Sequence, residues 1–530
     1  MEALEVPEDN KKGGVVMACT MFAAIDVGSY EVRLKIYELS PRKGIHVVNH
    51  VSHRIELGKD TYATGRIGTE LVDELCSVFL DFQRMMKEFG VEEYRACATS
   101  AVRESKNSIV LLDRIYQKTG IRLEVLSNSE QRFIGYKSIA SSSERFSEII
   151  EKGTAIVDVG GGSIQISLFD KDNLVTTQNI RLGTLRLRER LADVAERTVK
   201  YAGVIEELLN NEMRTYRKLY LKDRNIRYLL LVGNYIQYIN QYIHKYPSIN
   251  QITKEEFITF YDTFIKTGQD KMAEALGFQD GNNSLLLPTL VIYKRLLEET
   301  GAENVVILGT DLGDGLAFDF AERKKILKPA HNFENDIIEA ARNIAKRYHT
   351  NRNHTQVMER IALTIYDKMK AYHGLSKRER LLLQIAVLLH DCGKYINMSH
   401  SSECSYNIIM ATEIIGLSHM EREIVANIVQ FNSGRLKPFE ELVGSTLLER
   451  SEYITIVKLT AILRIANAMD RSHKQKIKNI RVNVKDHHTM QILVDTAEDL
   501  TLEQAMFQEK AEFFEEVYSL RPILKVKKAD

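Results

Sequence analysis

The sequence predicts an α/β protein with two related halves, followed by an all-helical region and a small α+β unit. A buried strand that runs into Asp-Val-Gly occurs twice, at Ala24–Ser29 and at Ile156–Gly161. Repetition on the scale of a domain indicates two halves of common architecture. Beyond residue 330, glycine becomes scarce and long helical patterns dominate, which is typical of an all-α region.

In the first half, apolar and alternating segments predict strands, and apolar residues at helical spacing predict helices. The expected strands are Met21–Asp26, 32–39, Ile45–Val51, Tyr94–Thr99 and Arg122–Leu126. The expected helices are Thr69–Glu88, Ser108–Lys118 and one that begins near Ser129, with Ser127 or Asn128 as its N-cap.

In the second half, the same criteria predict strands at Thr154–Asp158, Ile164–Phe169, Tyr228–Val232 and Val305–Leu308 within a mainly helical segment. The end of the chain predicts strands at Ile480–Val484 and Gln491–Val494, a helix at Leu502–Leu520 and a last strand. We therefore expect a disordered tail at 1–20, halves at 21–140 and 141–325, a Lys324–Pro329 linker, a helical domain at 330–475 and the α+β unit at 476–530.

Composition limits the classes of function. A chain of 530 residues exceeds what one hydrophobic core supports. With 72 basic and 72 acidic residues, nothing global favours nucleic acid or a membrane surface as a partner. The five cysteines, without CxxC spacing, indicate a reduced, cytoplasmic setting. An acidic N-terminus is unlike a secretory signal, and the natural start is alternatively Met17 or Met21.

The two Asp-x-Gly turns suit a phosphate site. Gly28 has no Cβ, so its backbone allows a phosphate to approach closely, and Gly160-Gly161-Gly162-Ser163 offers the same with more room. A carboxylate at each strand end, Asp26 or Asp158, suits a hydrated Mg²⁺ ion. Two such turns in register are a much stronger signal than one, because Asp-Gly turns close many ordinary hairpins.

Four segments, in this order, resemble the exopolyphosphatase/guanosine-pentaphosphate phosphohydrolase (PPX/GppA) family: Ala23–Leu34, Ala98–Glu104, Asp158–Ser163 and Leu182–Leu187. The resemblance covers about residues 21–320. It implies an actin-like ATPase-type fold of two ribonuclease-H-like halves with the active site in the cleft between them. It also implies polyphosphate or guanosine pentaphosphate as substrate, and a homodimer.

The resemblance also implies roles for single residues. Asp26, Gly28 and Ser29 correspond to the first phosphate loop, and Gly160, Gly161, Gly162 and Ser163 to the second, with Asp158 on Mg²⁺. Thr99, Ser100 and Arg103 correspond to residues that hold phosphates of the chain. Glu130 matches the catalytic glutamate, which would orient water and take its proton; the plain alternative is an ordinary glutamate in the first turn of a helix.

Several positions depart from the family pattern. Tyr30-Glu31 stands where the family usually has Asn-Ser, and Gln165 replaces a glutamate. An amide cannot act as an anionic metal ligand or base, so the rate and the metal dependence are open. The arginines between Arg181 and Arg190 suit either a polyanion path or a solvated helix start.

The helical region holds a second candidate site. His354, the adjacent pair His390-Asp391 and the distant Asp470 resemble the ligand set of HD-domain metal phosphohydrolases. Imidazole and carboxylate together suit Mn²⁺, Fe²⁺, Co²⁺ or Zn²⁺. Lys394, one turn after His390, could meet a phosphate oxygen. The alternative is a set of buried, hydrogen-bonded polar residues in a helix bundle.

Together these features predict an exopolyphosphatase-type hydrolase that removes a terminal phosphate by metal-assisted attack of water. Two alternatives stay open. The metal quartet could hydrolyse a nucleotide, with the first two halves as a sensor. The chain could instead bind polyphosphate or an alarmone without turnover, for which Gln165 is the motivation.

Overall fold

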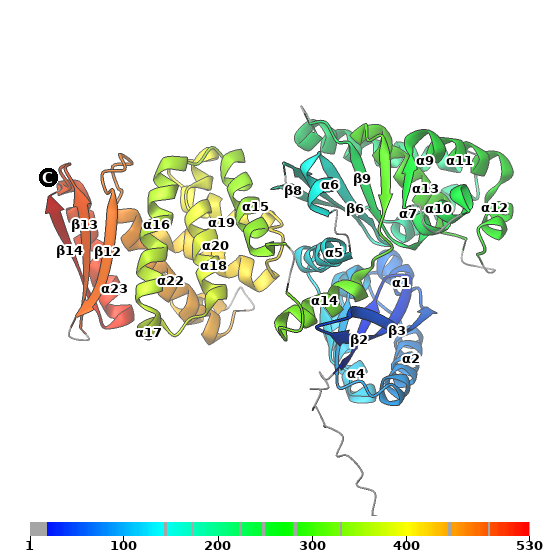
Figure 1. Ribbon diagram of the computed structural model, residues 1–530, viewed down its shortest axis with the longest axis horizontal. Coiled ribbons are helices and arrows are strands. Elements are labelled where there is room, and N and C mark those ends of the chain that lie inside the picture. Colours follow the sequence, from blue (N-terminus) through cyan, green and yellow to red (C-terminus); the bar gives the residue numbers. More distant parts are fainter. Residues whose placement is uncertain are drawn as a thin grey trace, which may run out of the picture. The chain divides into compact units, whose positions relative to one another are not determined.

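The computed structural model describes residues 19–528, apart from short gaps at 143–145, 172, 199, 222–223, 246–249, 279–282, 329–330, 444–447 and 486–487 (Figure 1). The expected tail at 1–20 therefore lies outside the described residues up to residue 18, and its last residue, Thr20, begins a strand. The chain divides into two compact units. Unit 1 comprises the chain up to Val125 and the segment Leu312–Ala330; unit 2 comprises Leu126–Asp311 and His331–Asp530.

Unit 1 contains a five-stranded sheet in the order β3-β2-β1-β4-β5. The first three strands form antiparallel hairpins, and β4 and β5 add in parallel. The strands are β1 (Thr20–Val27), β2 (Glu31–Ser40), β3 (Gly44–Arg54), β4 (Glu93–Ala98) and β5 (Leu123–Val125). Its helices are α1 (Leu57–Thr64), α2 (Thr69–Glu88), α3 (Ser100–Glu104), α4 (Ser108–Thr119) and α14 (Leu312–Arg323).

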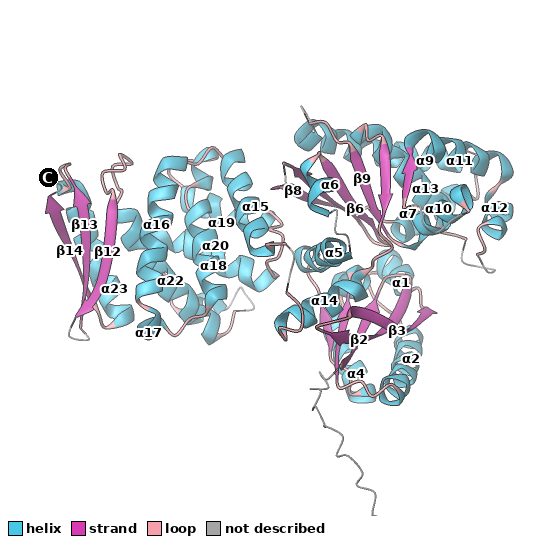
Figure 2. Ribbon diagram, viewed as in Figure 1, coloured by secondary structure: helices cyan, strands magenta, loops and turns pink. Residues whose placement is uncertain are grey.

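Unit 2 repeats this topology in a six-stranded sheet, β10-β11-β9-β6-β7-β8 (Figure 2). Antiparallel β6–β7–β8 match β1–β2–β3, and β9 and β11 add in parallel as β4 and β5 do. The predicted duplication is confirmed at the level of sheet topology. The strands are β6 (Thr154–Val159), β7 (Ile164–Asp170), β8 (Asn173–Ile180), β9 (Tyr228–Val232), β10 (Gln251–Thr253) and β11 (Asn304–Ile307).

Apolar side chains of helices between residues 184 and 300 pack against this sheet in one core. The sequence did not predict β8 and β10, which are an outer strand and a three-residue strand. The helices are α5 (Asn128–Ser142), α6 (Phe146–Glu151), α7 (Thr184–Arg190), α8 (Ala192–Ala195), α9 (Tyr201–Tyr216), the π-helix η1 (Arg217–Leu221), α10 (Asn234–His244), α11 (Lys254–Thr267), α12 (Gln269–Ala275) and α13 (Leu286–Thr300).

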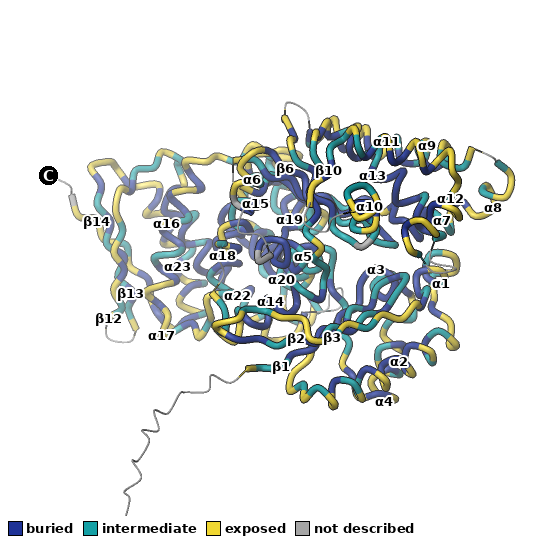
Figure 3. Tube along the Cα trace, turned by 45° about the vertical axis from the view of Figure 1, so that its right-hand side comes forward, coloured by how far each residue is buried: buried dark blue, intermediate teal, exposed yellow. Residues whose placement is uncertain are grey.

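The helical region surrounds a central helix, α18 (Lys377–Leu389), whose residues from Leu381 to Leu389 are all buried (Figure 3). No helix among the described residues is long and apolar enough to cross a membrane. The other helices are α15 (Phe333–Arg347), α16 (Arg352–Lys368), α17 (Lys370–His373), the 3-10 helix η2 (Cys392–Tyr395), α19 (Ser401–Ala411), α20 (His419–Ser433), α21 (Phe439–Val443) and α22 (Arg450–Ala468).

The last elements are β12 (Asn479–Lys485), β13 (Thr489–Thr496), α23 (Thr501–Tyr518) and β14 (Arg521–Lys528), as the pattern predicts. Their apolar side chains, such as Ile492 and Phe514, belong to the same core as α16, α18 and α22. The sequence placed a separate unit at 476–530, but the helical region and this unit share one hydrophobic core.

The division between the halves also differs from the expected one. The boundary at 140 placed α5 with the first half, and the boundary at 325 placed α14 with the second. In the structure α5 belongs to unit 2 and α14 returns to unit 1, where Phe320 stacks on Phe22 of β1 with ring centroids 4.3 Å apart. Long-range apolar packing of this kind is not visible in local sequence patterns.

Candidate functional site

The first predicted loop, Asp26–Ser29, closes the β1–β2 hairpin in unit 1. The amide of Gly28 donates to the carbonyl of Glu31 at 3.0 Å, and a Cβ on Gly28 would lie 2.9 Å from that oxygen. Glycine is therefore required by the turn itself. Glu31 pairs with Arg33, whose guanidinium also lies 3.9 Å from the carboxylate of Asp26. The residue that departs from the family pattern thus belongs to a charge network around Asp26.

Parallel pairing of β1 and β4 brings Thr99 and Ser100 beside this loop. Val27 pairs with Ala98, and the Thr99 amide donates to the Val27 carbonyl at 3.1 Å. The hydroxyls of Ser29 and Ser100 lie 2.9 Å apart, and Tyr62 of α1 contacts both, at 2.7 and 3.1 Å. The structure therefore gathers Ser29, Thr99 and Ser100 just beyond the carboxyl ends of β1 and β4.

Sequence reasoning missed Tyr62. Its position in α1 carries no motif, and only the chain reversal after β3 brings it to the two serines. Arg103 lies in α3, and its amide donates to the Thr99 carbonyl at 3.0 Å. The predicted phosphate-holding residues of unit 1 thus share one edge of the sheet, at the start of α3.

The second loop, Gly160–Ser163, closes the corresponding β6–β7 hairpin in unit 2. The Gly160 amide donates to the Ser163 carbonyl at 3.0 Å, which reproduces the Gly28 turn. Among the residues that the structure describes, the amides of Gly161 and Gly162 have no backbone acceptor. Two neighbouring N–H groups of this kind form a concave donor site that suits an anion.

Gly183, at the start of α7, packs directly against the backbone of this loop. The amides of Thr184 and Arg186 donate to the carbonyls of Gly160 and Gly161, at 3.1 and 2.9 Å. A Cβ on Gly183 would lie 2.3 Å from the Ser163 nitrogen and 2.4 Å from the Gly160 oxygen. The Arg186 side chain also donates to the Gly162 carbonyl at 2.8 Å, which fixes this arginine on the loop.

A row of polar side chains follows the second loop across three strands. Asp158 of β6 pairs in register with Gln165 of β7, and Gln165 pairs with Asn179 of β8. Gln165 is 3% exposed, and its Oε1 has no hydrogen-bond partner among the described residues. Burial without a partner is costly for an amide oxygen, and a carboxylate there would cost more without a cation.

Glu130, the predicted catalytic residue, lies in the first turn of α5. Its carboxylate accepts from the Ser127 amide at 3.0 Å and from the Ser127 hydroxyl at 2.6 Å, while its own amide donates to that hydroxyl at 3.3 Å. This reciprocal pattern is a capping box, with Ser127 as the N-cap. The structure therefore gives Glu130 a helix-capping contact, which a general base would have to exchange for water.

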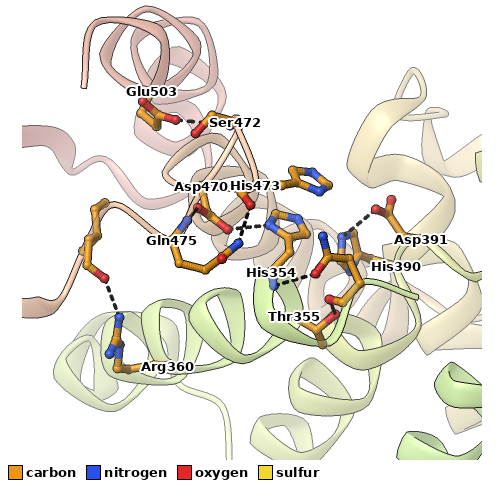
Figure 4. Close-up of polar contacts among 12 residues, drawn as sticks. His354, Thr355, Arg360, His390, Asp391, Asp470, Ser472, His473, Gln475 and Glu503 are labelled. Carbon is orange, nitrogen blue, oxygen red and sulfur yellow. Dashed lines mark hydrogen bonds and ion pairs between the residues drawn. The ribbon is translucent and has the colours of Figure 1, made fainter. Parts of the chain in front are cut away.

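The second candidate site lies in the helical region, where His354 of α16 meets His390 and Asp391 after α18 (Figure 4). Ligand atoms of these three side chains lie within 4.8 Å of one another. Both histidines are buried, and the Nε2 atoms of both lack a hydrogen-bond partner among the described residues. Converging imidazole nitrogens and a carboxylate fit a divalent transition metal.

Asp470, the fourth predicted ligand, contacts His354 instead of joining that group. Its carboxylate lies 2.7 Å from Nδ1 of His354 and accepts from the Gln475 amide at 2.9 Å. A carboxylate on Nδ1 fixes the ring so that Nε2 points to the ligand group. The Nδ1 of His390 is fixed in the same way by the Val387 carbonyl, at 2.7 Å.

The ring of His473, a residue that no sequence motif singles out, stacks on that of His354, with centroids 3.6 Å apart (Figure 4). Its φ of 55° lies in the left-handed region, a conformation that follows from the turn after α22. Spacing gave no signal for it, because it is three residues beyond a predicted ligand on a non-helical turn. Lys394, the residue predicted to meet a phosphate oxygen, donates to Asp391 at 2.6 Å.

Burial and neighbouring charge set the protonation of this group. Burial lowers the pKa of His390, against a smaller opposite effect of Asp391, so its imidazole stays neutral and able to bind metal at lower pH than usual. Burial alone would raise the pKa of Asp391, but His390 and Lys394 outweigh it and the pKa lies below its ordinary value.

Two family models match the chain, one over the part with the two large sheets and one over the helical region. A model of the Ppx/GppA phosphatase family matches residues 36–324, and a model of Ppx/GppA phosphatase domain III matches residues 338–511. Exopolyphosphatase 2 of Mycobacterium tuberculosis is 26% identical over 210 residues, which are 37% of this chain and 63% of that protein. The chain spans 47% of another curated relative, the bifunctional 3-dehydroquinate synthase/phosphatase of Fusobacterium nucleatum.

A guanosine-5'-triphosphate,3'-diphosphate pyrophosphatase of Photobacterium profundum is 17% identical over 449 residues, covering 84% of this chain and 86% of that protein. A crystal structure of an exopolyphosphatase from Cytophaga hutchinsonii, 16% identical, covers 58% of this chain and 100% of its own, with a TM-score of 0.50. This likeness concerns the fold.

Proposed function

Because the chain belongs to the Ppx/GppA phosphatase family, we propose that it hydrolyses the terminal phosphoanhydride of linear polyphosphate or of guanosine pentaphosphate. The observation that carries the proposal is the second loop, where the Gly161 and Gly162 amides are open and the backbone is fixed by Gly183 and Arg186. Fixed N–H donors stabilise charge that develops on a phosphoryl group without reorganisation.

In this proposal, Asp158 would hold a Mg²⁺ ion, which would neutralise phosphate charge when bound. Asp158 lies on β6, directly before the second loop. The Ser29, Thr99 and Ser100 hydroxyls would bind the phosphates that follow the terminal one. Glu130 would exchange its contact with Ser127 for the attacking water and take its proton.

The test measures phosphate release from polyphosphate and from guanosine pentaphosphate with Mg²⁺, for the wild type and Glu130→Gln. Glutamine keeps an oxygen for the Ser127 cap and removes only the base. We expect kcat to fall at least about 100-fold. The matched control is Glu70→Gln, an exposed glutamate in the first turn of α2, which should leave kcat unchanged.

Two results would contradict this scheme in different ways. Tight binding of polyphosphate without any phosphate release by the wild type would indicate a binding regulator, and Gln165→Glu would then be the variant to assay for turnover. Full activity of Glu130→Gln would remove the proposed base while leaving the substrate assignment intact.

A second candidate function is favoured by the group His354, His390 and Asp391. We propose that these residues hold Mn²⁺, Fe²⁺ or Zn²⁺ in the manner of HD-type phosphohydrolases and that a nucleotide phosphate is hydrolysed there. Asp470 orients His354, and Lys394 would turn from Asp391 to the phosphate.

Metal content of the purified protein tests this without any substrate. Asp391→Ala should lower bound transition metal at least about tenfold, because one of three ligands is lost. His400→Ala, an exposed histidine on the same segment, is the control. Wild-type protein without any transition metal after loading with Mn²⁺ or Zn²⁺ would refute the site.

A further inference from the structure

The first turn of α5 is held by a segment of the helical region. We call residues Thr412–Ser418, between α19 and α20, the 412–418 segment. Asn128 donates to one carboxylate oxygen of Glu413 at 2.8 Å, and Arg132 donates to the other at 2.8 Å. The Ser129 hydroxyl donates to the carbonyl of Leu417 at 2.6 Å. Residues on both sides of Glu130 are therefore bound to this segment.

The contact between Glu413 and Arg132 is desolvated. The Arg132 side chain is 4% exposed and that of Glu413 is 22% exposed. Burial lowers the pKa of the Arg132 guanidinium, while Glu413 and then Asp158 act in the opposite direction. Without Glu413, the charge of Arg132 would lack the hydrogen-bonded carboxylate that offsets its burial, so α5 would have to move to rehydrate it.

The 412–418 segment is itself fixed on the helical region. Arg378 donates to the Gly416 carbonyl at 2.5 Å, and Arg422 donates to the Thr412 carbonyl at 3.3 Å. Gly416 has a φ of 76°, and a Cβ there would lie 2.7 Å from the Ile337 side chain. Packing this close leaves the segment little freedom, so it is a rigid support for whatever it binds.

Glu413 also contacts the six-stranded sheet of unit 2. The hydroxyl of Thr177, on β8, donates to the backbone carbonyl of Glu413 at 3.3 Å. Glu413 thereby joins three elements: the outer strand of the sheet, the first turn of α5 and the helical region.

We propose that Glu413 is a positioning residue, which sets the first turn of α5 so that the Glu130 carboxylate is directed to the reacting phosphate. The inference rests on the proposed hydrolysis and extends it, because it makes the helical region a part of the catalytic geometry. A displacement of about 1 Å in a catalytic group costs up to about 100-fold in rate. Substrate phosphates bind elsewhere, on the loops, so KM should change little.

The variant Glu413→Gln keeps the size of the side chain but sets an amide group against one of its two donors. On polyphosphate with the full chain, we expect kcat to fall at least about tenfold with KM within about twofold. Glu206→Gln is the control, since Glu206 forms a more exposed ion pair with Lys294, between α9 and α13. It should change neither constant.

A second readout separates positioning from stability. Glu413→Ala combined with Arg132→Leu removes both charges of the pair. A merely structural role predicts that thermal stability and kcat both recover relative to Glu413→Ala alone. Positioning predicts recovered stability with kcat still low. In hydrogen exchange, Glu413→Gln should speed exchange of the amides of α5 and leave those of α18 unchanged.

The outcomes keep the two proposals apart. A wild type without phosphate release refutes the proposed function, while unchanged exchange in α5 refutes the support by Glu413. An active wild type, an inactive Glu130→Gln and a Glu413→Gln variant with wild-type kcat would overturn this inference and leave the proposed function standing.

Discussion

Replacing Gly183 with alanine would place a methyl group inside the backbone of the second loop. The new Cβ would lie 2.3 Å from the Ser163 nitrogen, 2.4 Å from the Gly160 oxygen and 2.5 Å from the Gly161 carbonyl carbon, where ordinary contacts begin at 3.4 Å. The loop or α7 must therefore move by about 1 Å. Because all three atoms are backbone, no side-chain rotation relieves the contact.

A loop displaced by about 1 Å should lose about 100-fold in kcat/KM, or about 2.7 kcal/mol of transition-state stabilisation. Overpacking of this kind costs a further 1–3 kcal/mol or so in stability. Phosphate release from polyphosphate measures the first effect, and thermal unfolding the second. Gly203→Ala in α9 is the control, because its Cβ meets nothing within 4 Å. A Gly183→Ala variant with wild-type kcat/KM would refute the role of the loop.

Two further predictions concern stability. His373 is buried, with Nε2 against the Tyr366 carbonyl and Nδ1 accepting from the Leu375 amide, so the fold requires its neutral form, and burial lowers its pKa from 6.5. The unfolded chain binds the proton more readily, so the free energy of unfolding should fall as pH drops below about 6.5. Urea unfolding at pH 7.5 and 5.5 measures this fall, which should be smaller in His373→Asn than in the wild type. An equal fall in the two proteins would contradict this account. Tyr62→Phe removes hydrogen bonds to two serine hydroxyls and should cost about 1 kcal/mol of unfolding free energy in urea, whereas an unchanged midpoint would show that water replaces them.

Local patterns were sufficient for most of the fold. The helix expected at Thr69–Glu88 and the strand at Tyr228–Val232 match the structure residue for residue, because the helix has one continuous apolar period and the strand is one unbroken apolar run. The duplicated Asp-x-Gly turns predicted matching hairpins, since glycine at such a turn follows from local backbone geometry. The grouping of His354, His390 and Asp391 was also predicted, from the resemblance to HD-domain metal phosphohydrolases.

What the sequence did not reveal depends on contacts between distant segments. Glu413 is one glutamate in a short connection, and only the packing of α19 and α20 brings it to α5. His473 reaches His354 through a left-handed turn that no motif marks. Asp470 was expected among the ligands, but its distance to Nδ1 of His354 could not be derived from its place in the chain.

The return of α14 to unit 1 has a consequence for synthesis on the ribosome. The strands β1–β5 emerge first, but the helix that covers Phe22 and bonds Lys35 and Tyr37 through Asp314 is made only after residue 311. One apolar face of the unit 1 sheet therefore stays uncovered while the entire second sheet is translated. Unit 1 therefore completes its fold only after the second sheet has been made, although its own strands are made first. Nascent chains arrested before residue 312 should be more sensitive to proteases in unit 1 than chains arrested beyond residue 330.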